Sequence, residues 1–146
     1  MRVPGALEGE DLRVVAQTGK AQGQNMSAYP DGQWSGARQL WWTGAKPGDR
    51  MTLAFPVAQP GRYGLEAVLT RAPDYGVVRF HLDGQPLGEK QIDLFGSRVT
   101  TTPQLALGER ELAAGEHRLT VEVTGANPEA VKNFMFGLDY LWLQRK

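Results

Sequence analysis

Three acidic side chains stand near the two ends of the sequence, where they could bind a metal ion. Glu8 and Glu10 precede an apolar run near the start, and Asp139 lies in an apolar segment near the end. Because residues two apart share one side of a strand, Glu8 and Glu10 are in phase with Leu12, and Asp139 is in phase with Leu141. We therefore expect all three carboxylates on the core-facing sides of the first and last strands, at the ends where these strands enter the sheet.

Carboxylates that face a core are costly unless they are paired, hydrogen-bonded or neutralised by a metal. These donors are hard oxygen ligands and the chain has no cysteine, which favours Ca²⁺ as the ion. We predict a calcium ion held by Glu8, Glu10 and Asp139, with backbone carbonyl groups completing its shell. Its role is expected to be structural, because its ligands lie on strands, and it requires the first and last strands to be neighbours.

A second group of candidate residues is aromatic. Three of the four tryptophans are close together, and Trp34 falls within the irregular stretch 17–38, which reads as a long loop rich in Gln, Gly, Ser and Asn. An exposed indole can cover the C–H face of a sugar while amides and carboxylates pair its hydroxyls. The alternative is that these rings are core, since alternation puts Trp41 and Trp42 on opposite faces. We predict Trp34 as a ligand-binding residue, Trp42 as a candidate floor of the site, and one of Trp41 and Trp42 as core.

A short loop adds two polar candidates. Asp74 and Tyr75 join two regions that are expected to be strands. An Asp-Tyr pair in a loop could hydrogen-bond to a sugar and stack on it. It could equally form a turn in which Asp74 caps backbone amides and Tyr75 anchors the loop. Both interpretations stay open at the level of sequence.

The elements that must position these residues are short strands. Eighteen glycines and nine prolines divide the chain into short pieces, and no long helical period appears. Apolar residues alternate along 51–57, 63–69, 78–82 and 119–123. With both ends and the segments 39–43 and 99–107, about eight or nine strands result. The pattern predicts an all-β protein, a two-sheet antiparallel β-sandwich of jelly-roll type, as a single domain over 1–146.

The order of several short motifs resembles a known family. The Glu-x-Glu start and the finish 138–141 resemble carbohydrate-binding modules of the galactose-binding-like β-sandwich superfamily, especially families 6, 35 and 36. The middle agrees in order at 48–53, 61–65, 82–84 and 112–119. The segments 39–42, 72–76 and 125–128 are similar to modules appended to bacterial glycoside hydrolases, including those with a DUF2961 catalytic domain. The resemblance spans almost the whole chain.

This resemblance carries implications for both sites. In those families the first strand often carries Glu-Ala-Glu and the last an Asp that bind a structural calcium; here Gly9 takes the middle position. An Asn or Asp just before the final strand often touches ligand, which makes Asn133 a candidate because Asn127 is suited to cap a helical turn. The loops are then expected to converge at one edge of the sandwich around Trp34, Asp74, Tyr75 and Asn133.

Bulk properties exclude several kinds of partner. The 16 Lys and Arg balance the 16 Asp and Glu, which leaves no electrostatic footprint for nucleic acid or an anionic membrane. No apolar stretch reaches the length of a membrane span. The start lacks the features of a signal peptide and reads as a piece cut from a longer protein, so we expect an extracellular or periplasmic location through a parent whose signal is not in this chain. His81 is expected to be exposed, and with His117 it makes neither a metal site nor a base–nucleophile pair.

Together these features predict a non-catalytic carbohydrate-binding module with a structural calcium. Its partners would be an oligo- or polysaccharide and the catalytic domain of a parent glycoside hydrolase. The alternative is an accessory β-sandwich domain that packs against that catalytic domain or oligomerises. A small glycosidase would need a pair of carboxylates across an open cleft. The conspicuous pair, Glu8 and Glu10, suits a metal better, which argues against an enzyme.

Overall fold

The computed structural model describes residues 5–146, apart from the side chains at positions 89 and 90. Nearly all of its regular structure is β-strand: β1 (Leu7–Glu8), β2 (Arg13–Gln17), β3 (Lys20–Asn25), β4 (Arg38–Thr43), β5 (Arg50–Val57), β6 (Gly61–Arg71), β7 (Val77–Leu82), β8 (Gln85–Asp93), β9 (Thr100–Thr101), β10 (Leu105–Leu112), β11 (Gly115–Gly125) and β12 (Phe136–Arg145). Within the described residues, the helical segments are two 3₁₀ turns, η1 (Gly9–Asp11) and η2 (Ser35–Ala37).

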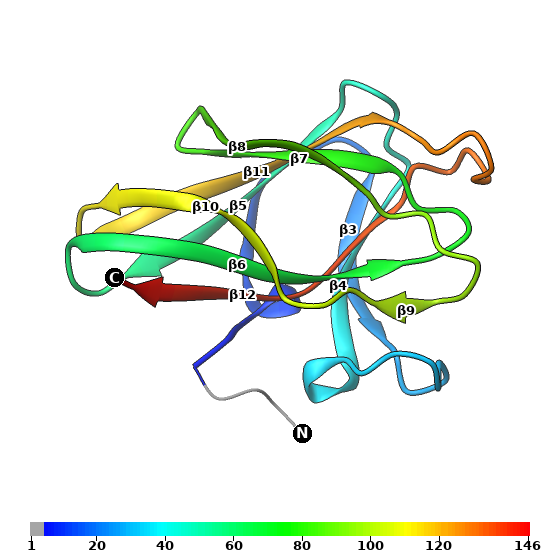
Figure 1. The fold of residues 1–146 in the computed structure, drawn as a ribbon, viewed down its shortest axis with the longest axis horizontal. Helices are drawn as coiled ribbons and strands as arrows, with labels where there is room; N and C mark the ends of the chain where they lie inside the picture. Colours follow the sequence, from blue (N-terminus) through cyan, green and yellow to red (C-terminus); the bar gives the residue numbers. More distant parts are fainter. Residues whose placement is uncertain (1–4) are drawn as a thin grey trace.

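The strands form two antiparallel sheets packed face to face. One sheet has the order β10-β6-β12-β4-β3, with β1 paired to β12 and β9 paired to β6. The other has the order β2-β5-β11-β7-β8. Figure 1 shows them as two layers, with β7, β8 and β11 above β6, β9 and β12. The predicted two-sheet β-sandwich is therefore confirmed.

The core lies between the two sheets and follows the predicted alternation. On β5 the residues Met51, Leu53 and Phe55 are at most 2% exposed, and on β6 the residues Leu65 and Leu69 are fully buried. At about 25 cal/mol for each Å² of apolar surface removed from water, this layer supplies the main driving force for the fold. The largest fully buried side chains are Trp42, Phe55, Phe136, Met51, Leu53, Leu65, Leu69, Leu82, Leu94, Leu119, Leu138 and Leu141.

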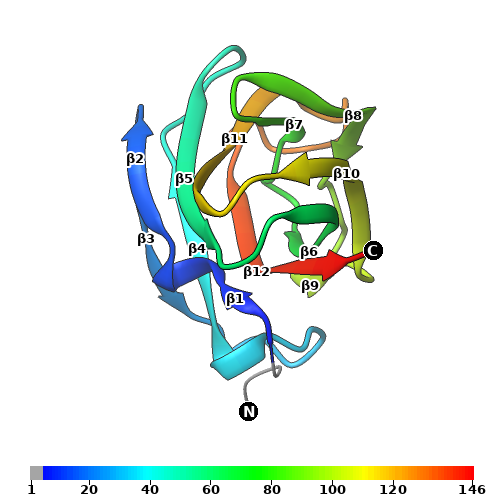
Figure 2. The same ribbon diagram turned by 90° about the vertical axis from the view of Figure 1, so that its left-hand side faces the viewer.

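The two ends of the chain meet in one sheet, as predicted. β1 pairs antiparallel with β12, with Leu7 opposite Leu141 and Glu8 opposite Tyr140, and Figure 2 shows the two strands beside each other. The predicted first strand is nevertheless not continuous. After Glu8 the chain turns through η1 and crosses to the other sheet, where β2 pairs with β5. Glu10 lies in the turn, so the shared strand phase predicted for Glu8, Glu10 and Leu12 is wrong.

Two strands were not expected from the sequence. β3 lies inside the stretch 17–38 that was predicted as a loop, and β8 follows the hairpin turn after β7. Each of them ends its sheet and is paired on one side only. Edge strands of this kind carry polar or small side chains on their exposed surface, so they lack the hydrophobic alternation that reveals a central strand.

Candidate functional site

The three predicted metal-binding carboxylates come together around irregular backbone. Glu8 is 5% exposed and immediately precedes η1, while Glu10 lies within η1. Asp139 is fully buried at a β-bulge of β12, where Leu138 pairs with Leu69 but Tyr140 already pairs with Val68. Their common position is thus the junction of β1, η1 and β12.

The bulge corrects the expected position of Asp139. An extra residue in one strand shifts the alternation of side chains that follows it. Leu138 and Leu141 are both fully buried in the core even though they are three residues apart. The carboxylate of Asp139 is turned toward η2 instead, where both of its oxygens accept hydrogen bonds from the backbone N–H of Ser35.

Gly9 explains the spacing of the two glutamates. A Cβ at this position would lie 2.2 Å from the backbone oxygen of Leu138, which is far closer than real Cβ contacts. Only a residue without a side chain allows η1 to lie this close to β12. The glycine between the acids is therefore what brings Glu8 and Glu10 against the strand that carries Asp139.

Ser35 bridges two of the carboxylates. Its backbone N–H lies 3.0 Å from Asp139 Oδ1 and 3.2 Å from Oδ2, and its hydroxyl donates to Glu8 Oε1 across 2.8 Å. Burial raises the pKa of Asp139 to about 7; the Ser35 N–H acts in the opposite direction, and Glu8 and Glu10 add to the rise. Burial and the neighbouring carboxylates thus make the charged form of Asp139 costly to keep in the folded protein.

The donors in this cluster fit a hard cation by their chemistry. Glu8 Oε2 is buried and accepts no hydrogen bond from the part of the chain that the structure describes, and both carboxylate oxygens of Glu10 are buried as well. Across residues 5–146, no group of three or more Asp, Glu, His or Cys side chains is already arranged to hold a metal. The cluster therefore supplies donor atoms of a suitable kind, but their arrangement in this structure is not that of a formed metal site.

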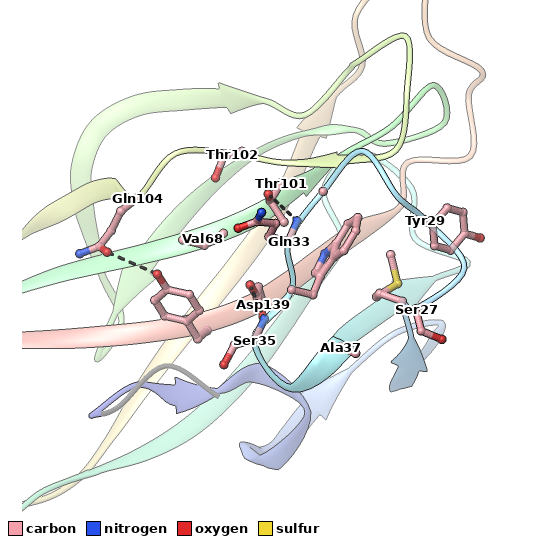
Figure 3. Close-up of a pocket in the computed structure, with 14 residues that line it drawn as sticks. Ser27, Tyr29, Gln33, Ser35, Ala37, Val68, Thr101, Thr102, Gln104 and Asp139 are labelled. Carbon is pink, nitrogen blue, oxygen red and sulfur yellow. Dashed lines mark hydrogen bonds between the residues drawn. The ribbon is translucent and has the colours of Figure 1, made fainter. Parts of the chain in front are cut away.

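A cleft with a volume of about 830 Å³ lies directly beside this cluster. Figure 3 shows it between the β3–β4 loop and the segment that leads from β9 to β10, with Val68 of β6 and Asp139 of β12 at its floor. Its lining residues are Met26, Ser27, Tyr29, Gly32, Gln33, Trp34, Ser35, Ala37, Val68, Thr101, Thr102, Gln104, Asp139 and Tyr140. Aromatic rings, amides and hydroxyls thus share one concave surface.

Trp34 lines the cleft but is more buried than the sequence suggested. Its side chain is 8% exposed, and its indole N–H donates to Thr70 Oγ1 across 2.9 Å. A Cβ at Gly32 would lie 2.4 Å from the indole, so the loop backbone covers part of the ring. The loop is held to β9 by the backbone N–H of Gln33, which lies 3.3 Å from Thr101 Oγ1. Trp34 therefore anchors the loop that forms one wall of the cleft.

Tyr29 is the accessible aromatic residue that the sequence interpretation missed. It is 36% exposed and meets Trp34 edge to face, with 6.3 Å between ring centroids and 61° between ring planes. It also lines a second, smaller depression of about 130 Å³ beside the cleft. Tyr29 stands before Pro30 in a loop rich in Gly, Ser and Gln, but its exposure depends on how this loop folds over Trp34, which the local sequence does not reveal.

Two more predicted residues lie in the second depression. Asp74 and Tyr75 line it together with Trp41 and Tyr29. Tyr75 is 4% exposed, and its hydroxyl accepts a hydrogen bond of 3.0 Å from Gln39 Nε2. Burial raises the pKa of Tyr75, whereas the bond with Gln39 opposes this rise. The structure therefore favours Tyr75 as a residue that anchors its loop, while Asp74 lines the wall of the second depression.

The loop before the last strand meets the same end of the sandwich. Tyr75 forms a bridge with Met135, and the backbone N–H of Met135 donates to the Asp74 carbonyl oxygen across 3.2 Å. Asn133, however, lines a separate depression of about 610 Å³ with Lys46. The loops converge as predicted, but their candidate residues are divided among three neighbouring depressions rather than one shallow site.

Two expectations are corrected by burial. Trp42 is fully buried in the core, and its indole N–H donates to the Thr18 carbonyl oxygen across 2.7 Å. Its ring is therefore inaccessible and does not form the floor of a ligand site. His81 was expected to be exposed, but it is 5% exposed, and its Nε2 lies 2.9 Å from Glu122 Oε1 across the β7–β11 pair.

Within residues 5–146, no helix is long and apolar enough to cross a membrane.

Comparison with known proteins identifies the fold. No family model and no curated protein matches the sequence. A xanthan lyase from Paenibacillus aligns with a TM-score of 0.85 and 20% identity, over 100% of this chain and 14% of the lyase. A family 35 carbohydrate-binding module from Clostridium thermocellum aligns with a TM-score of 0.59 and 18% identity, over 97% of this chain and 99% of the module. The CBM36-1 domain of a multidomain xylanase from the hindgut metagenome of Trinervitermes trinervoides aligns with a TM-score of 0.55 and 13% identity, over 97% of this chain and 96% of the domain.

The chain thus has the β-sandwich fold of family 35 and 36 carbohydrate-binding modules, and the resemblance drawn from its motifs is confirmed at that level. It corresponds in length to a whole module and to about a seventh of the xanthan lyase.

Proposed function

We propose that this chain is a non-catalytic module that binds a glycan in the cleft beside Tyr29. The fold supports this, because family 35 and 36 carbohydrate-binding modules share it over their full length. The observation that carries the proposal is the arrangement of an exposed Tyr29 at the edge of the Trp34 ring, at the rim of a cleft whose walls are amides and hydroxyls.

This arrangement matches the chemistry of a sugar. A pyranose ring presents a face of C–H groups and a rim of hydroxyls, so it needs an aromatic surface together with hydrogen-bonding groups. Tyr29 supplies the accessible ring, while Gln33, Thr101 and Gln104 supply polar atoms around it. Hydroxyl groups lose much of this gain to desolvation, so the dissociation constant should be roughly micromolar to millimolar.

We also propose that Glu8, Glu10 and Asp139 hold a structural Ca²⁺. The ion would neutralise the buried carboxylates, which burial and mutual repulsion otherwise destabilise. Ser35 contacts Glu8 and Asp139 and directly follows Trp34 in the chain. A fixed carboxylate cluster would therefore also fix the start of the wall of the cleft.

The module is inferred to serve a larger polysaccharide-degrading enzyme outside the cytoplasm. Support comes from the neighbours: one is a domain of a multidomain xylanase, and another aligns with a small part of a xanthan lyase. The buried state of Glu8 and Asp139 is unsuited to a catalytic pair, which has to reach a substrate in an open cleft.

A second candidate function is favoured by an apolar depression between the edge strands β8 and β10. Its volume is about 780 Å³, and its apolar lining comprises Phe80, Leu87, Ile92, Leu105 and Leu107. Such a surface suits an accessory domain that packs against a catalytic domain or against a second copy. Sedimentation velocity tests the second case: self-association that Ile92→Lys abolishes would favour it.

The binding proposal is tested by affinity electrophoresis through gels that contain soluble polysaccharides, with Ca²⁺ present. Tyr29→Ala is expected to lose retention by the cognate polysaccharide while its melting temperature stays close to that of the parent, since surface substitutions cost little. Val131, the other exposed large hydrophobic residue in the described part of the chain, provides the matched control. Val131→Ala should be retained normally. Unchanged retention of Tyr29→Ala would place the sugar elsewhere.

A further inference from the structure

We propose that the cleft selects an uncharged glycan and discriminates against glycans that carry carboxylate groups. This inference rests on the proposed function and names the substrate class of the same site. It comes from the described side chains that line the cleft, which include a carboxyl group and no cation.

Among residues 5–146, the side chains that line the cleft include no cation. Among the described residues that line it, Asp139 is the one with an ionisable carboxyl group, and no Lys, Arg or His takes part. The remaining polar groups are neutral amides and hydroxyls, from Gln33, Thr101, Thr102 and Gln104 among others. Such groups can pair with sugar hydroxyls, but they cannot offset the cost of removing a carboxylate from water.

Acidic side chains lie at the floor of the cleft and behind it. Asp139 lies at the floor, and Glu8 is joined to it through Ser35. Glu66 precedes the floor residue Val68 by two positions on β6, so the two side chains share one face of the sheet. An acidic glycan entering the cleft would therefore meet like charges from its floor.

The arginines near the cleft are directed elsewhere. Arg98 lies 3.9 Å from Asp31 in an exposed pair, and neither residue lines the cleft. The guanidinium group of Arg38 lies over Gly23 on the neighbouring strand, close to Glu10, and Arg38 is not among the residues that line the cleft. The described part of the chain thus places no guanidinium group in the cleft lining that could form the bidentate contacts that carboxylates usually receive.

The test compares neutral and acidic polysaccharides with the same backbone in affinity gels. Hydroxyethylcellulose and carboxymethylcellulose form the matched pair, whereas galactan and polygalacturonate, which also differ in linkage, give a looser comparison. Neutral glucomannan, xylan and acidic xanthan extend the set. At low ionic strength, where charge effects are largest, retention by the acidic member of a pair should be at least tenfold weaker. Tyr29→Ala should abolish the retention by the neutral member.

An engineered cation provides the second arm. Gln104 is an exposed residue on the cleft wall, so its replacement should leave the fold intact. Gln104→Arg is expected to increase retention by the acidic polysaccharides severalfold relative to Gln104→Ala, and the increase should fade as salt is added.

Three outcomes are decisive. Preference for the neutral members together with the gain in Gln104→Arg supports the proposal. Retention by an acidic polysaccharide that matches or exceeds that by its neutral partner, and that Tyr29→Ala removes, overturns it but leaves the binding function standing. Retention by no polysaccharide overturns both the function and this inference.

Discussion

The indole N–H of Trp34 donates a hydrogen bond to the hydroxyl of Thr70, with 2.9 Å between Nε1 and Oγ1. Thr70 in turn donates to Gln39 Oε1, and Gln39 Nε2 donates to the hydroxyl of Tyr75 across 3.0 Å. A buried polar chain therefore joins the loop that forms the cleft wall to the wall of the second depression. Because Gln39 and Thr70 are fully buried, losing one partner would leave the others without a replacement from water.

Replacing Trp34 with alanine is therefore expected to lower the free energy of unfolding by about 3–5 kcal/mol, the usual cost of removing a buried aromatic ring of this size. The ring is 8% exposed and the loop backbone at Gly32 lies against it. Urea denaturation measures the loss. Trp34→Phe keeps most of the ring but removes the N–H donor, so its cost should be nearer 1–3 kcal/mol. An unchanged midpoint in the alanine variant would mean that this ring does not anchor the loop.

The central strands could be predicted because apolar residues recur at every second position along them. Met51, Leu53 and Phe55 alternate with residues of the outer face, and the structure buries all three of them. The same reasoning predicted that the two chain ends would pair, since Glu8 and Asp139 had to share one environment. Alternation placed Trp41 and Trp42 on opposite faces but did not say which of them is core, and the choice of Trp42 as a candidate floor was wrong because its ring is fully buried.

The details of the candidate site could not be predicted because they depend on breaks in regular structure. No pattern marks the β-bulge at Asp139, since it becomes visible only when the partner strand is known. The turn at Gly9 depends likewise on how close Leu138 comes. The exposure of Tyr29 depends on how its loop folds over Trp34, a long-range contact that local sequence does not encode.

Removal of calcium is expected to lower the melting temperature, and added Ca²⁺ should restore it. An ion that binds only the folded state raises stability by mass action. The proposed ligands Glu8 and Asp139 are at most 5% exposed and gain most from neutralisation. Differential scanning fluorimetry with EDTA, then with excess Ca²⁺, measures the shift. Asp139→Asn, which keeps the shape of the side chain, should show no response to either.

The size of the EDTA effect should increase with pH. Burial raises the pKa of Asp139 to about 7 in the metal-free protein, from an ordinary value of 3.8. Between these values the folded state binds more protons than the unfolded state, so the free energy of unfolding of the metal-free protein falls as pH rises. The difference between the EDTA and Ca²⁺ samples should therefore be greater near pH 8 than near pH 5. A constant difference would contradict the buried carboxylate cluster.

Gly9→Ala should disturb the carboxylate cluster directly. The new Cβ would lie 2.2 Å from the carbonyl oxygen of Leu138, so η1 has to move away from β12. The expected cost is about 1–3 kcal/mol, as for other overpacked sites, together with a weaker response of the melting temperature to Ca²⁺. Gly125→Ala is the matched control, because a Cβ there meets nothing within 4 Å. Equal stability of the two variants would show that η1 does not need a glycine.

His117 is expected to make stability fall as pH rises above neutrality. Its Nδ1 lies 2.6 Å from Asp83 Oδ2 and its Nε2 lies 2.7 Å from the carbonyl oxygen of Ala113. Both partners are acceptors, so both bonds form only when the ring is the doubly protonated imidazolium. Burial lowers the pKa of His117, but the bonds to Asp83 and Ala113 outweigh it, so the pKa lies above its ordinary value of 6.5.

The sign of the effect follows from that shift. A group whose pKa is higher in the folded state stabilises the protein fully below the unfolded value, about 6.5, and loses this contribution as pH rises through the folded value. The free energy of unfolding should therefore fall by about 1 kcal/mol from about pH 6 to about pH 9. His117→Gln cannot gain a proton, so its curve should be flatter than that of the parent, with the difference largest at the acidic end. His81→Gln serves as the control for the other histidine. Parallel curves for His117→Gln and the parent would show that the imidazolium does not join the β7–β8 turn to the β10–β11 turn.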